Sequence, residues 1–245
     1  NRIKDENKKL EDKNKEMFDG LKDRQKADKY YVNVLMEEIR KETIINGTRC
    51  VGIDLGVKDL IITSDGIKYK ALKTIKKYEN KIKGLNKWLS RCERTSKNRL
   101  KVLTKLERAY QKLKNARKNY TDIITKKIID NYDYIFIEDL SITKMIENAK
   151  TTLTKKILDS TLSEIVRKLE YKTKWNNKTL IKVDRYFKSS QKCCICGNIN
   201  KETKNLNVRN WKCSECNTNH DRDINASINI LFEGLRLYYK NEYGL

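Results

Sequence analysis

The sequence of 245 residues contains no proline and only nine glycines. It also has no run of eighteen or more apolar residues, the length at which a transmembrane helix is considered, and its first residues do not resemble a signal peptide. We therefore expect neither membrane insertion nor secretion. The absence of proline, together with abundant lysine, asparagine and isoleucine, is typical of an AT-rich genome and indicates nothing about mechanism.

Acidic residues are too few to balance the basic ones. The chain has 55 Lys and Arg against 33 Asp and Glu, a formal net charge of +22. This excess is larger than solubility requires and indicates a polyanionic partner. Nucleic acid is the first candidate and an acidic membrane surface a weaker second. We expect a cytoplasmic protein, associated with the nucleoid in a bacterial host.

The seven cysteines favour metal binding over disulfides, because thiols stay reduced in the cytosol. Four of them form two Cys-x-x-Cys pairs separated by sixteen residues, Cys193 with Cys196 and Cys213 with Cys216. This is the spacing of a four-thiolate ribbon, which favours zinc over iron. Four sulfur ligands leave no position for water or substrate, so the predicted zinc is structural. Cys194 could compete with Cys193, but the spacing to Cys196 selects Cys193.

Apolar patterning predicts an α/β fold with inserted segments. Runs rich in β-branched residues predict strands within 50–70, with a hairpin turn, and within 131–140 and 180–187. Helical spacing predicts two antiparallel helices at about 72–128, a helix at about 154–175, and a last helix after residue 220.

The predicted helical hairpin is dense in basic residues and has few acids to offset them. A solvated face and a surface that binds a phosphate backbone fit this pattern equally well, and neither gives sequence specificity. The candidate nucleic-acid contacts in this region are Lys76, Lys77, Lys87, Arg91, Arg94, Lys97 and Arg99.

Three acidic residues have comparable settings. Asp54 lies in the first predicted strand, Glu138 ends a later strand, and Asp223 precedes the last helix, just after the second cysteine pair. Singly, each would more often be a cap or a salt-bridge partner. Gathered from separate elements, carboxylates repel one another, so such a cluster is tolerable mainly when divalent cations neutralise it. A pair of Mg²⁺ ions about 3.5 to 4 Å apart can activate water and stabilise the leaving oxygen of a phosphodiester, which is nuclease chemistry.

At these motifs the chain resembles the C-terminal part of the transposon-encoded TnpB proteins, relatives of the type V CRISPR effector nucleases. The matching segments, over roughly residues 48–235, are GIDLGVKDL, FIEDLSI, SSQKCCICG and WKCSECNTNHDRDINASINI. The resemblance implies an RNase H-like (RuvC) mixed sheet with a basic helical-hairpin insertion and an inserted four-Cys zinc ribbon. In that family the ribbon contributes to target nucleic-acid binding.

The resemblance also implies residue roles. Asp54, Glu138 and Asp223 would be the catalytic acids that bind Mg²⁺ or Mn²⁺, and the position before x-Asn-Ala selects Asp223 over Asp221. Arg222 is a candidate nucleic-acid contact, although a structural contact fits it as well. The implied partners are target DNA and a guide RNA from the transposon locus, and the oligomeric state stays open.

The implied organisation has four parts. Residues 1–47 are a charged arm and the remnant of an N-terminal wedge domain, and residues 48–188 are the nuclease core with the first two acidic motifs. Residues 189–219 form the zinc ribbon, and residues 220–245 hold the third acidic motif and the C-terminal helix. Complete family members carry a wedge and a helical recognition lobe before this core, and we expect most of those modules to be absent from this chain.

Three functions remain as hypotheses. The first is a transposon-associated, RNA-guided, divalent-metal-dependent DNA endonuclease, or its catalytic fragment. The second is a non-catalytic zinc-ribbon remnant or regulator of a transposable element, which binds nucleic acid through the hairpin and ribbon alone. The third takes GIDLG as the phosphate-binding hairpin of the actin and sugar-kinase ATPases. Nine glycines leave little material for the second phosphate loop of such an ATPase, so this hypothesis is the weakest.

Overall fold

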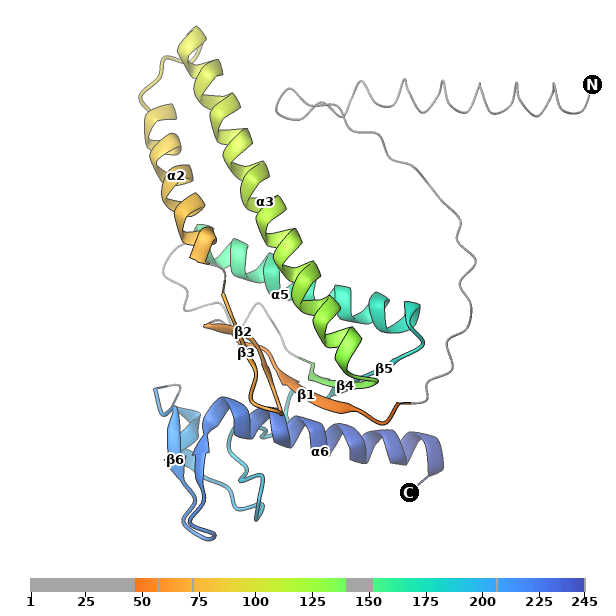
Figure 1. Ribbon diagram of the computed structural model, residues 1–245. Helices are drawn as coiled ribbons and strands as arrows, with labels where there is room; N and C mark the ends of the chain where they lie inside the picture. The colour runs from red at the N-terminus through yellow and green to blue at the C-terminus, as the bar shows by residue number, and fades with distance from the viewer. Residues whose placement is uncertain (1–46, 57, 72, 140–151, 206, 245) are drawn as a thin grey trace, which may run out of the picture. The chain divides into compact units, whose positions relative to one another are not determined.

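The computed structural model describes residues 47–56, 58–71, 73–139, 152–205 and 207–244, with only the backbone at 73–76 and 152–160 (Figure 1). The predicted charged arm lies outside these ranges except for residue 47, as does the side chain of Lys76. The described chain divides into two compact units, Asn80–Lys114 and the rest. We describe each unit by itself.

The larger unit is built on a five-stranded mixed sheet. Its strands are β1 (Cys50–Asp54), β2 (Asp59–Thr63), β3 (Lys68–Lys70), β4 (Tyr134–Glu138) and β5 (Thr179–Val183). Their spatial order is β3-β2-β1-β4-β5, and β2 alone runs antiparallel to its neighbours. The strands predicted within 50–70, 131–140 and 180–187 are confirmed, and so is the mixed α/β class.

Helices cover both faces of this sheet (Figure 1). The C-terminal part of α3 (Lys97–Asn131) and α5 (Thr152–Trp175) lie on one face, and α6 (Arg222–Tyr243) lies on the other. Strand residues alternate between the faces, so each core takes every second residue. The first core includes Val51, Ile53, Ile135, Ile137, Ile124, Ile128, Leu162 and Ile165. The second includes Phe136, Val183 and Ile230.

Helix α6 approaches the sheet closely because a glycine lies at each of two contact points, one on β1 and one on the helix itself. A Cβ atom on Gly52 of β1 would lie 2.0 Å from the carbonyl oxygen of Ser227, and one on Gly234 of α6 would lie 2.3 Å from the ring of Phe136. Real Cβ atoms do not tolerate such distances, so no larger residue fits without movement of the helix. The two contacts fix the position of α6 along β1 and β4.

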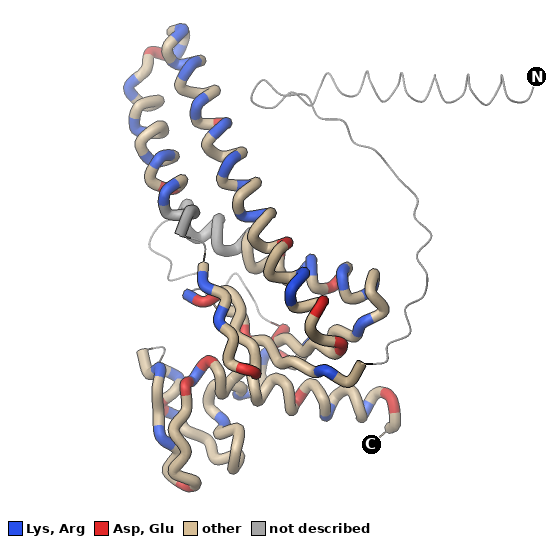
Figure 2. The backbone as a smooth tube through the Cα atoms, viewed as in Figure 1, with Lys and Arg blue, Asp and Glu red and all other residues tan. Residues whose placement is uncertain are grey.

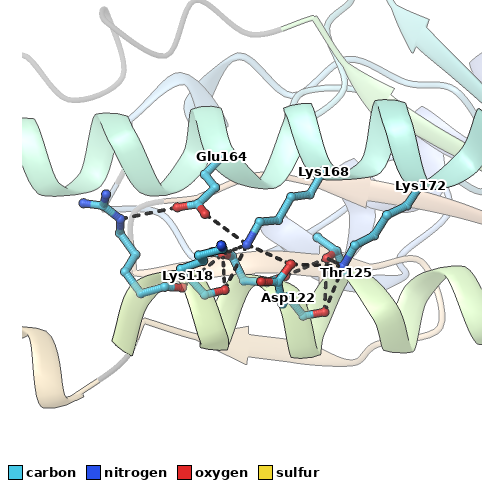
Figure 3. A network of polar contacts seen from close by, with 8 residues as sticks. Lys118, Asp122, Thr125, Glu164, Lys168 and Lys172 are labelled. Atoms are coloured by element: carbon cyan, nitrogen blue, oxygen red, sulfur yellow. Dashed lines mark hydrogen bonds and ion pairs between the residues drawn. The ribbon is translucent and has the colours of Figure 1, made fainter. Parts of the chain in front are cut away.

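On the opposite face, a buried lysine joins α3 to α5 (Figure 3). Lys168 is 1% exposed, and its ammonium lies 2.9 Å from Asp122 Oδ1 and 3.0 Å from Glu164 Oε1. It also donates hydrogen bonds to the hydroxyl of Thr121 (2.7 Å) and the carbonyl of Lys118 (2.9 Å). A buried charge is costly unless it is paired in this way, so the network favours a single register between the two helices.

A second ion cluster joins the ends of three strands. Asp133, just before β4, accepts a hydrogen bond from the backbone N–H of Arg49 (3.2 Å) and lies 3.3 Å from Lys178 Nζ. Burial acts to raise the pKa of Asp133, but these hydrogen bonds and the charges of Lys178 and Arg49 outweigh it and lower the pKa. The ionised carboxylate therefore stabilises this edge of the fold.

The smaller unit is a helical hairpin made of the C-terminal part of α2 (Lys73–Leu89) and the N-terminal part of α3. Its buried side chains include Ile82, Leu85, Val102, Leu106, Ala109 and Leu113. The neighbouring Tyr110 is 43% exposed, whereas Ala109 is buried. None of the helices in the described residues is both long and apolar enough to cross a membrane.

The close approach of α6 predicts the effect of Gly234→Ala. The added methyl group would overlap the Phe136 ring, so we expect the free energy of unfolding to fall by about 1–3 kcal/mol. Gly84→Ala in α2 is the control, since a Cβ there meets no atom within 4 Å. It should raise stability by up to about 1 kcal/mol through helix propensity. Urea denaturation measures both, and equal stability of the two variants would contradict this packing.

The Asp133 cluster predicts a pH dependence. Because its pKa is lowered on folding, its contribution is present above the unfolded value of about 3.9 and is lost as the pH falls through the folded value. We expect Asp133→Asn to cost about 1–3 kcal/mol at pH 7 and progressively less as the pH falls below about 3.9. The control is Asp130→Asn, at an exposed position nearby. Urea denaturation at each pH measures the difference in stability between wild type and Asp133→Asn. A difference that does not become smaller as the pH falls would refute this account.

Candidate active site and cysteine cluster

Asp54 and Glu138 lie side by side at one edge of the sheet. They end β1 and β4, which are parallel neighbours with Ile53 paired to Ile137. Because Ile53 and Ile137 point into the core beneath α3 and α5, the next residues point to the α6 face. Alternation along two adjacent strands thus brings both carboxylates to the same place.

Asp223 enters from the first turn of α6. The helix begins at Asp221, whose carboxylate accepts hydrogen bonds from the N–H groups of Asp223 (3.0 Å) and Ile224 (3.1 Å). Asp221 also pairs with Lys68 at 2.6 Å, which anchors the helix start to β3. Asp221 is therefore the N-cap of α6, and the Asp223 side chain is free of that role.

The three acids share one electrostatic environment. Burial raises the pKa of Asp54 to about 8, helped by the negative charges of Glu138 and Asp223 and opposed by Arg222. Burial also raises the pKa of Glu138 to about 7, opposed by a hydrogen bond from Ser189. Burial is thus the main reason that these two acids favour the protonated form, and a nearby cation would favour the ionised form.

Arg209 supplies part of that compensation. Its Nη1 donates to both carboxylate oxygens of Asp223, at 3.1 and 2.9 Å. Sequence reasoning did not single out this arginine. Its position follows from the pairing of β6 (Asn210–Lys212) with β7 (Asn219–Asp221). Arg209 directly precedes β6, and the pairing brings it next to the start of α6. The backbone N–H of Arg222 donates to the Arg209 carbonyl at 2.8 Å, which closes this junction.

Arg222 itself lies inward rather than on an open surface. Its side chain is 9% exposed, its charge lowers the pKa of Asp54, and its Nε has no hydrogen-bond partner among the described residues. Its position fits a group that supports Asp54 better than one that contacts a long polyanion.

The other predicted nucleic-acid contacts lie on the helices. Lys77, Lys87, Arg91, Arg94 and Lys97 are exposed, whereas Arg99 is partly buried and donates to the Leu89 carbonyl at 3.2 Å. The segment Asn80–Lys114 holds twelve Lys or Arg and two Glu, so this unit alone carries a net charge of +10. Basic residues follow both of its helices in Figure 2.

The four predicted cysteine ligands come together. The Sγ atoms of Cys193, Cys196, Cys213 and Cys216 all lie within 4.8 Å of one another. Two of these separations are 3.6 Å (Cys193 to Cys216) and 3.5 Å (Cys196 to Cys213). Tetrahedral coordination with bonds of about 2.3 Å places sulfurs about 3.8 Å apart, so the donor set fits zinc. In the described part of the chain, no other group of three or more His, Cys, Asp or Glu side chains brings its ligand atoms as close together.

Residues in the left-handed conformation shape both knuckles. Gly197 and Asn217 each follow the second cysteine of a pair, with φ of +82° and +58°. Their N–H groups donate back to the carbonyls of Cys193 (2.9 Å) and Cys213 (3.1 Å). Glycine and asparagine are the residues that adopt this conformation most readily, so the sequence after each pair suits the turn.

Cys194 stands apart from the cluster. Its backbone N–H donates to Asn225 Oδ1 at 3.0 Å, and its sulfur lies 4.0 Å from His220 Nδ1. The other side of the His220 ring faces the cluster, with Nε2 at 3.1 Å from Cys193 Sγ, and the ring packs against Trp211. His220 therefore has a structural place beside the cysteines.

Comparisons with known proteins agree with this arrangement. Residues 163–230 match the family model "Cas12f1-like, TNB domain", and residues 31–149 match the OrfB_IS605 model, "Probable transposase". A Streptomyces pristinaespiralis protein named "Putative RNA-guided DNA endonuclease" is 32% identical over 212 residues, which are 86% of this chain and 52% of that protein. InsQ of Escherichia coli (strain K12), which bears the same description, is 29% identical over 223 residues, 86% of this chain and 55% of InsQ. The chain thus spans about half the length of these relatives.

Solved structures show the same fold. Cas12f1 in its complex with sgRNA and target DNA aligns with a TM-score of 0.51 at 22% identity, over 80% of this chain and 52% of Cas12f1. A CRISPR-Cas12f ternary complex aligns with a TM-score of 0.54, also at 22% identity, over 82% of this chain and 41% of that one. The class is therefore an α/β fold of the Cas12f kind. By sequence, the chain is a TnpB-type relative of the type V effectors.

Proposed function

We propose that this chain carries the nuclease site of a transposon-associated, RNA-guided DNA endonuclease that requires divalent metal ions. The observation that carries the proposal is the convergence of Asp54, Glu138 and Asp223 from two adjacent strand ends and a helix start. The names of the relatives support nuclease activity at the level of the family. The chain spans only about half the length of these relatives, so RNA guidance of this chain is proposed from their names.

The sheet topology supports an RNase H-like (RuvC) core. A central β1 has an antiparallel hairpin on one side and parallel strands on the other, and helices cover both faces. In this interpretation the basic helical hairpin is an insertion between β3 and β4, and the four-cysteine ribbon is an insertion between β5 and α6.

The donor set suits Mg²⁺ or Mn²⁺, because hard cations prefer carboxylate oxygens. Asp54, Glu138 and Asp223 would hold the ions, which supply charge stabilisation and an activated water for phosphodiester hydrolysis. Arg222 favours the ionised form of Asp54, and Ser189 favours that of Glu138. Arg209 pairs with Asp223 in this structure. A metal ion bound to Asp223 would replace this pairing and leave the Arg209 guanidinium available to contact a phosphate.

Nucleic-acid binding is assigned to the basic surfaces. The +10 charge of Asn80–Lys114 suits contact with phosphates along a duplex or a single strand. Trp88 in this unit is 48% exposed, with the Lys105 ammonium 4.9 Å from the centre of its ring, a combination that suits base stacking next to a phosphate contact. Target DNA and guide RNA are the proposed occupants.

The same hairpin carries the second candidate function, a non-catalytic nucleic-acid-binding protein. Its charge and exposed aromatic residue would bind nucleic acid whether or not the acidic site is active. Affinity that falls steeply with salt is expected under both functions, so cleavage alone separates them.

The acidic site predicts the result of a cleavage experiment. We expect labelled DNA to be cut with Mg²⁺ or Mn²⁺ in the presence of RNA from the native locus. Asp54→Ala or Glu138→Gln should lower the rate by more than about 100-fold, because loss of a ligand should cost more than loss of a ligand's hydrogen-bonding partner, which typically costs 10- to 100-fold. Asp139→Asn is the matched control, because this neighbour of Glu138 pairs with Arg185 at 2.7 Å instead. Retained cutting in both acidic variants would refute the site. Salt-dependent binding with no cutting by wild type would favour the second function.

The cysteine cluster predicts metal content. The purified chain should hold about one zinc ion, and Cys196→Ser should lower both the zinc content and the melting temperature, because four thiolates contribute folding free energy through the metal. Cys92→Ser in the hairpin is the control and should retain the zinc. Elemental analysis and a thermal melt measure both quantities. Full zinc content in Cys196→Ser would contradict the assignment.

A further inference from the structure

The loop that follows β5 passes directly over Glu138. Strand β5 is parallel to β4, Val183 pairs with Glu138, and the N–H of Asp139 donates to the Val183 carbonyl at 2.8 Å. The chain that leaves β5 must therefore run along the edge of the sheet where the acids lie. From this loop the Ser189 hydroxyl donates to Glu138 Oε2 at 3.1 Å.

Ser189 is buried and held from behind. Ser189 is 6% exposed. Its backbone carbonyl accepts a hydrogen bond from Asn229 Nδ2 of α6 at 2.8 Å. The same amide nitrogen donates to the carbonyl of Lys192 at 2.6 Å. Asn229 is 4% exposed, and a buried amide is costly unless it is hydrogen bonded, so these bonds fix the loop against the helix.

One turn earlier on α6, Asn225 makes a second clamp on the same loop. Its Nδ2 donates to the Lys192 carbonyl at 2.8 Å, and its Oδ1 accepts from the N–H of Cys194 at 3.0 Å. Asn225 is 1% exposed. The two asparagines therefore connect the first cysteine knuckle to the segment that contacts Glu138, on the helix that also carries Asp223.

We propose that Ser189 is a positioning residue of the nuclease site, which orients the Glu138 carboxylate for metal binding and is itself held by Asn229. The inference rests on the proposed function. The hydrogen bond uses one carboxylate oxygen, so the other can bind a cation. Partners of metal-binding carboxylates typically change metal affinity 10- to 100-fold when they are removed.

The experiment measures Mn²⁺ binding to the 245-residue chain without nucleic acid, by the electron paramagnetic resonance signal of unbound Mn²⁺. Ser189→Ala should weaken Mn²⁺ binding by about 10-fold or more. Ser189→Thr keeps the hydroxyl and should restore most of the affinity. Ser190→Ala is the matched control and should bind as wild type does. The Mn²⁺ concentration that gives half-maximal cleavage should rise in Ser189→Ala by the same factor, with zinc content and DNA affinity unchanged.

A merely structural role for Ser189 would change the melting temperature but not the affinity for Mn²⁺. Equal Mn²⁺ affinity in Ser189→Ala and Ser190→Ala would therefore overturn the inference. Should Ser189→Ala not fold, Ser189→Cys replaces it, since a thiol has similar size and is a weak donor. The same loss of affinity is expected of it.

The failure of this inference is distinguishable from the failure of the proposed function. Wild-type binding that disappears in Glu138→Gln but persists in Ser189→Ala would overturn the role of Ser189 and leave the nuclease site standing. Wild type and Glu138→Gln that both fail to bind Mn²⁺ would overturn the site itself and, with it, the role of Ser189.

Discussion

The rest of the structure depends on the close contact between α6 and the central strands. Gly52 lets the Ser227 carbonyl reach β1, and Gly234 admits the ring of Phe136. Asp223 lies four residues before Ser227, so it is on the same face of the helix and about one turn, 5.4 Å, along its axis. A helix pinned at Ser227 therefore carries Asp223 to the edge of the sheet where β1 and β4 end. The position of Asp223 therefore depends on this close contact, which is possible only because Gly52 and Gly234 have no side chains.

The same contact creates an electrostatic problem that the surrounding residues only partly solve. Burial, together with the negative charges of Glu138 and Asp223, raises the pKa of Asp54 to about 8, and burial raises the pKa of Glu138 to about 7. Arg222 and Arg209 each offset part of the negative charge. Strongly shifted pKa values of this kind are typical of functional sites in proteins, although ion pairs that only stabilise a fold shift pKa values as well.

Sequence reasoning reached the elements that depend on local pattern and missed those that depend on tertiary contact. Apolar patterning placed Asp54 in the first strand and Glu138 at the end of a later one, and the cysteine spacing predicted the cluster. The bonds from Ser189 to Glu138 and from Arg209 to Asp223 join residues 51 and 14 positions apart, through strand pairings that periodicity does not reveal.

The boundary predicted at residue 189, between the nuclease core and the ribbon, separates residues that are in contact in the structure. Ser189 and Arg209 belong to the ribbon by position, yet each contacts an acid of the core. The second strand of the ribbon, β7, ends at Asp221, which is also the N-cap of α6. Because Asn225 and Asn229 hold the first knuckle against that helix, a change in the fold of the cysteine cluster would reach Glu138 and Asp223 through hydrogen bonds alone. The segment that holds the four cysteines is thus joined to the acidic site by direct contacts.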